Sequence, residues 1–204
     1  MSDHPEIAID LTPARRNAER VRDMLVALRQ RFDLTPFEYC KQVQIAPTET
    51  PFSHPRITLS SFVFNELDLV RMYLHEQMHW YVTWFSHTHP QRWKELFARL
   101  RDRYPRVPAA FEDGGAQDEA STYLHLVVNW LELETVSRLF PRDEVERHLR
   151  ALPFYRWIYQ TVVDDGQALG ALSRELVMSP IRPATEMSVE DLELAARMDE
   201  AATS

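Results

Sequence analysis

Residues 65–89 read NELDLVRMYLHEQMHWYVTWFSHTH, a stretch without Pro or Gly in which apolar residues occur on all sides of the predicted helix. A helix that is apolar all round is typical of a buried position in the core. Asn65 and Asp68 supply an N-cap and an acidic third position, so we expect the helix to begin there. Alternating patterns in residues 39–45 and 56–64 predict two short strands. The sequence therefore predicts a mainly α (α+β) fold, with a short β-sheet packed on this helix.

Within this stretch, residues 75–79 read HEQMH, an H-E-x-x-H pattern. On a helix, His75 and His79 lie one turn apart on the same face and can bind one metal ion. Glu76 lies beside them, where it could take a proton from a metal-bound water. Such groups are costly inside a buried helix unless they have partners. The pattern predicts a site for one divalent metal, with Zn²⁺ expected, and the alternative is a pair of hydrogen-bonded core histidines.

A catalytic zinc site uses three protein ligands and keeps a fourth position open, so a third ligand must be found. We favour His125, on a predicted helix over 118–140 where Asn129 and Glu132 share its face. Glu132 is the alternative, because about 10 Å along the axis separates it from His125 and one ion is not expected to bind both. The side chains of this face that do not bind the metal are expected to orient a ligand or contact substrate. His89 is a further candidate.

These residues resemble the zincin superfamily of metallopeptidases, and within it most closely the gluzincin layout. There, a second helix downstream of H-E-x-x-H supplies the third ligand, usually Glu, with Asp four residues later. His125 and Asn129 keep that spacing but not those residue types. Glu119 followed by Tyr123 fits the pattern less well.

Two other zincin layouts fit the chain less well. The segment from His89 to Lys94, HPQRWK, resembles the H-G-x-x-W/F-K segment of SprT-like proteases, although Pro90 replaces Gly. The metzincin pattern is not met, because Val82 stands where Gly is needed and Phe85 where His is needed.

The resemblance implies a small zincin-like catalytic domain that works as a zinc-dependent hydrolase, a peptidase or amidase acting on a peptide or small-molecule substrate. Glu76 would take the proton of the attacking water and pass it to the leaving amine. The oxyanion would need a further donor, for which Tyr155, Tyr159 and Tyr123 are candidates, each with a packed core tyrosine as the alternative. Two other functions stay open: a metal-dependent enzyme acting on a small metabolite or biosynthetic intermediate, and a non-catalytic metal-stabilised interaction domain.

The composition indicates which partners, which compartment and how many domains to expect. A net charge of −8 over 204 residues argues against nucleic acid as a partner. The absence of a long apolar run, of a signal-peptide pattern and of any cysteine besides Cys40 leads us to expect a cytoplasmic protein with no membrane partner. We predict one domain over residues 1–180 and an acidic C-terminal tail over 181–204, peripheral or partly disordered. The sequence does not indicate an oligomeric state.

Overall fold

The structure is a computed structural model that describes residues 7–11, 16–46 and 50–197. The chain divides into two compact units: one extends to Trp84 and resumes at Arg182, and the other runs from Phe85 to Ile181. Helices dominate the described residues, and a three-stranded sheet belongs to the first unit, so the predicted mainly α (α+β) class is confirmed. The division into a domain over 1–180 and a following tail stays a prediction.

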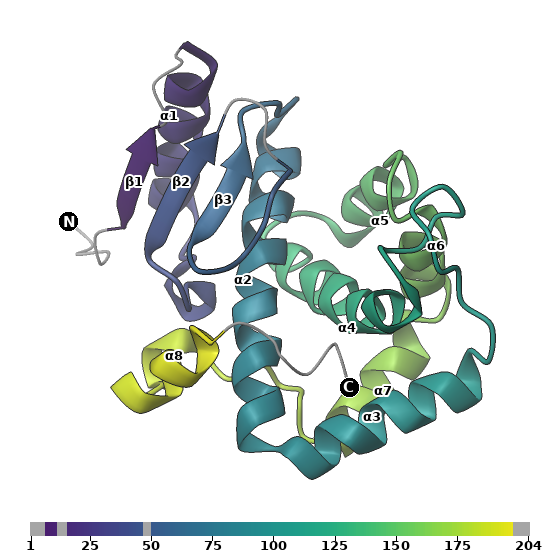
Figure 1. The fold of residues 1–204 in the computed structure, drawn as a ribbon. Coiled ribbons are helices and arrows are strands. Elements are labelled where there is room, and N and C mark those ends of the chain that lie inside the picture. Colours follow the sequence, from purple (N-terminus) through teal and green to yellow (C-terminus); the bar gives the residue numbers. More distant parts are fainter. Residues whose placement is uncertain (1–6, 12–15, 47–49, 198–204) are drawn as a thin grey trace. The chain divides into compact units, whose positions relative to one another are not determined.

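The first unit combines the sheet with helices (Figure 1). Its elements in chain order are β1 (Ala8–Leu11), α1 (Arg16–Arg31), η1 (Thr35–Phe37), β2 (Gln42–Ala46), β3 (Ile57–Ser60), α2 (Glu66–Thr88) as far as Trp84, η2 (Ala184–Glu186) and α8 (Val189–Ala195). The strands are parallel, in the order β1-β2-β3. Strands β2 and β3 fall within or next to the two predicted ones, whereas β1 was not predicted.

One face of the sheet supplies apolar side chains to the core. Val43 pairs with Ile57 and Ile45 with Leu59, and all four are at most 2% exposed. Since side chains alternate across a strand, Gln42 and Gln44 point to the opposite face. On α1, three buried residues at helical spacing form the apolar face: Val21, Leu25 and Leu28.

Helix α2 has the buried character that its sequence predicts. Every residue from Leu67 to Ser86 is buried except His79, which is partly exposed. The helix is capped as expected, because the Asn65 side chain accepts a hydrogen bond from the Asp68 backbone amide at 2.8 Å. The Gln77 side chain hydrogen-bonds both the backbone N–H and the carbonyl of Cys40, at 2.9 and 2.8 Å, and so fixes α2 to the segment that enters β2.

The second unit is helical in its described residues. After the last turn of α2 it contains α3 (Pro90–Arg103), α4 (Glu119–Val136), α5 (Arg142–Arg150), α6 (Arg156–Asp164) and α7 (Gly166–Glu175). Between α3 and α4 the chain forms a loop in which Gly114 has φ +86°, a conformation that favours glycine. The Thr122 hydroxyl donates to the carbonyl of Pro108 at 2.8 Å and accepts from the amide of Ala116 at 2.9 Å, so the loop is tied to the first turn of α4.

The segment after Ile181 returns to the first unit. Ser188 and Asp191 form a capping box at the start of α8, and the Asp191 carboxylate accepts a hydrogen bond from the Trp84 indole at 2.8 Å. Asp191 is therefore both a helix cap and a contact to α2. None of the helices in the described part of the chain has the length and apolar composition needed to cross a membrane.

Candidate metal site

His75 and His79 are brought together on one face of α2, as predicted. Their Nε2 atoms lie 3.3 Å apart, with the ring planes at 70° to each other. Two imidazole nitrogens bound to one tetrahedral zinc ion at about 2.05 Å would be separated by about 3.3 Å. The pair therefore already has the spacing that two ligands of one ion require.

Glu76 follows His75 directly and is 5% exposed. Position and burial together keep Glu76 as the candidate base of the first unit.

In the second unit, His125 presents one ring nitrogen as an acceptor. Its Nδ1 lies 2.7 Å from the carbonyl oxygen of Ser121, and since a carbonyl can only accept, Nδ1 carries the proton. Nε2 is then unprotonated and accepts from the Tyr155 hydroxyl at 3.1 Å. An unprotonated Nε2 is the form in which histidine binds a metal.

Glu132 and Asn129 lie on the same helix as His125 and are fully buried. Both carboxylate oxygens of Glu132 accept from the Tyr159 hydroxyl, at 3.0 and 3.3 Å. Neither side-chain polar atom of Asn129 has a hydrogen-bond partner among the residues that the structure describes. Buried amides without a partner are rare, so Asn129 marks a place where a water or another polar group is expected.

The remaining candidates have local structural roles. His89 is the residue before α3; its ring stacks on Phe85 at 4.7 Å and its Nδ1 lies 2.8 Å from the Thr88 hydroxyl. Burial, and then the charge of Arg92, lowers the pKa of His89. The Tyr123 hydroxyl donates to the carbonyl of Tyr104 at 2.6 Å, which accounts for it as a packing residue.

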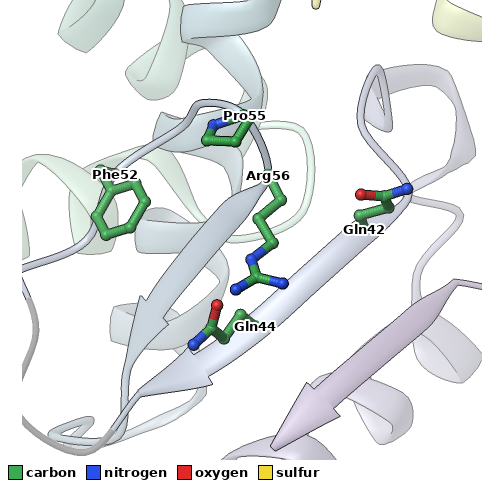
Figure 2. Close-up of a pocket in the computed structure, with 5 residues that line it drawn as sticks. All are labelled: Gln42, Gln44, Phe52, Pro55 and Arg56. Carbon is green, nitrogen blue, oxygen red and sulfur yellow. The ribbon is translucent and has the colours of Figure 1, made fainter. Parts of the chain in front are cut away.

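A cavity that the sequence did not suggest lies on the open face of the sheet (Figure 2). Its volume is about 380 Å³, and its lining consists of Gln42, Gln44, Phe52, Pro55 and Arg56. None of these is a predicted site residue. The only sequence signal is the polar alternation of Gln42 and Gln44 along β2.

Comparison of the chain with protein-family models, with curated proteins and with solved structures finds no match.

Proposed function

We propose that this protein is a zinc-dependent hydrolase of the zincin type, a peptidase or amidase, in which His75, His79 and His125 bind one divalent metal ion and Glu76 is the general base. The observation that carries the proposal is the 3.3 Å separation of the His75 and His79 Nε2 atoms, which matches two ligands of a tetrahedral ion.

The choice of His125 as third ligand rests on its donor atom. Each of the three histidines offers one imidazole nitrogen, and in this proposal all three bind the same ion. Nε2 of His125 is the unprotonated nitrogen, and three neutral imidazoles suit zinc. The two alternative ligands have partners within the second unit: Glu132 accepts from the Tyr159 hydroxyl, and Nδ1 of His89 lies 2.8 Å from the Thr88 hydroxyl.

In this proposal the metal, Glu76 and the buried polar residues of α4 have different roles in the reaction. When bound, the metal supplies Lewis-acid activation of the water and of the scissile carbonyl. Glu76 takes the proton of the attacking water and delivers it to the leaving amine, which avoids a separate acid. We assign Glu132 and Asn129, both buried on the same helix as His125, to orient a ligand or contact the substrate.

Glu76→Gln separates metal binding from catalysis. The variant is expected to keep about one equivalent of zinc and to hydrolyse substrate about 10²- to 10⁴-fold more slowly, because the amide cannot take a proton. Metal content by mass spectrometry and cleavage of a fluorogenic peptide and N-acyl amino acid library provide the two measurements. Glu66→Gln, at the exposed start of the same helix, is the matched control and should behave as the wild type. Full activity in Glu76→Gln would refute the role of this carboxylate.

A further inference from the structure

The Tyr155 hydroxyl is hydrogen-bonded to Nε2 of His125, the atom that would bind the metal in the proposed function. The Tyr155 hydroxyl lies 3.1 Å from Nε2 of His125, and the two rings are 4.6 Å apart. With Nδ1 donating to Ser121, Nε2 has one lone pair to offer. That lone pair can accept the phenol proton or bind a metal, but it cannot do both.

The backbone and neighbours of Tyr155 hold the ring beside His125. Tyr155 is the residue before α6 and has φ 50° and ψ 31°, a left-handed conformation that is uncommon for a residue other than Gly. Such conformations persist only where the surrounding structure holds them, and they concentrate at functional sites. The ring also contacts those of Phe111 and Phe154, at 5.9 and 5.8 Å between centroids.

The next turn of α6 repeats the arrangement with a different partner. Tyr159 donates to Glu132, so Tyr155, just before α6, and Tyr159, on α6, contact two polar residues seven apart on α4. Only the Tyr155 contact involves a proposed metal ligand. Tyr104 supplies the control, because its hydroxyl donates to Asp165, at 2.9 Å, outside the proposed site.

We propose that Tyr155 controls the metal affinity of His125: in the metal-free protein its hydroxyl occupies the Nε2 lone pair, and it gives up that hydrogen bond when a metal binds. The inference rests on the proposed metal site. Because Ser121 keeps the proton on Nδ1 whether or not the phenol is present, the loss of the phenol removes a competitor without changing the tautomer. Metal binding would then break the hydrogen bond between the Tyr155 hydroxyl and Nε2 of His125. The hydroxyl could afterwards donate to another group near the metal.

Zinc titration against a competing chelator tests this with the wild type, Tyr155→Phe and Tyr104→Phe. Removal of the competing hydrogen bond should tighten zinc binding by about 2- to 10-fold in Tyr155→Phe, while Tyr104→Phe should bind zinc as the wild type does. Nitrogen NMR of the histidines in the metal-free proteins should show His125 protonated at Nδ1 in all three, with the Nε2 resonance shifted in Tyr155→Phe alone.

The outcomes separate the two proposals. Zinc binding by the wild type together with equal or weaker binding by Tyr155→Phe would overturn the competing role of Tyr155 and leave the metal site standing. A wild type that does not bind zinc would overturn both. A His125 that is protonated at Nε2 in the metal-free wild type would also overturn the competing role, independently of any affinity and of the folding of the variants.

Discussion

His75 and His79 owe their geometry to α2. Two side chains four residues apart on a helix lie one turn apart, and the burial of the neighbouring turns limits the rotamers that each ring can adopt. The 3.3 Å separation of their Nε2 atoms is thus imposed by the packing of the helix. A site whose ligands are already in place loses little conformational entropy when a metal binds.

Glu38 is the residue whose replacement should destabilise the first unit most clearly. Its carboxylate, 1% exposed, accepts two hydrogen bonds from Arg29, at 2.6 and 2.8 Å, and one from Tyr73. Glu38→Ala leaves the Arg29 charge and the Tyr73 hydroxyl without this partner, so unfolding by urea should show a loss of about 3–5 kcal/mol.

Glu66 provides the control for that loss. Its ion pair with Arg31 is exposed at both side chains, 55% for Arg31 and 47% for Glu66. Glu66→Ala should therefore cost at most about 1 kcal/mol. Equal losses in the two variants would contradict the assignment of Glu38 as a buried structural partner.

The sequence predicts contacts between residues that are close together in the chain, but not contacts between residues far apart in it. The HEQMH spacing is sufficient to predict the His75 and His79 pair, because helix geometry alone brings them together. The Tyr155 contact to His125 joins residues thirty positions apart, and it depends on how α6 packs on α4. No periodicity in a single sequence encodes that distance.

Among the elements, the helices were predicted best. The long apolar pattern and the cap of α2 are local signals, and the structure has them where they were expected. Strand β1 was not predicted because a four-residue strand carries little periodicity and its pairing with β2 is made across α1.

Tyr104 connects α3 to the junction of α6 and α7, and this connection should depend on pH. Its hydroxyl donates to Asp165 at 2.9 Å, and burial raises the pKa of Tyr104 to about 12. An unfolded tyrosine has a pKa of about 10. Because the folded state favours the protonated form, this contribution is fully present below pH 10 and is lost as the pH rises from about 10 to about 12.

Urea unfolding at pH 8 and pH 11 measures that contribution. The wild type should lose more stability over this interval than Tyr104→Phe, which cannot ionise. The remaining slope in the variant reports other groups, such as Tyr81, whose pKa burial also raises to about 12. Parallel pH profiles for wild type and Tyr104→Phe would show that the hydroxyl does not couple ionisation to folding.

For the whole molecule, the fold class follows from composition and pattern but the division into units does not. The boundary between the units falls after Trp84, inside α2, and no run of Gly, Pro or Ser marks it. Sequence criteria for a boundary look for a polar or flexible linker, so a boundary within a buried helix escapes them. The return of residues 182–197 to the first unit is a long-range contact of the same kind.

The proposed third ligand depends on contacts that are distant in the chain, because the local pair of histidines on α2 would need a donor from another helix. His125 lies 46 residues beyond His79 in the chain. Its Nε2 is unprotonated and accepts a hydrogen bond from Tyr155, so His125 could bind a metal without a change of tautomer.

Calorimetric titration of the metal-free protein with zinc tests the three-histidine site most directly. The wild type and His148→Ala, a histidine on α5 outside the group, should each bind about one equivalent with the same affinity. His125→Ala should bind at least about 100-fold more weakly, because loss of a direct ligand costs at least as much as loss of an outer partner. Zinc binding by His125→Ala that equals that of His148→Ala, or a wild type that takes up no zinc, would contradict the site.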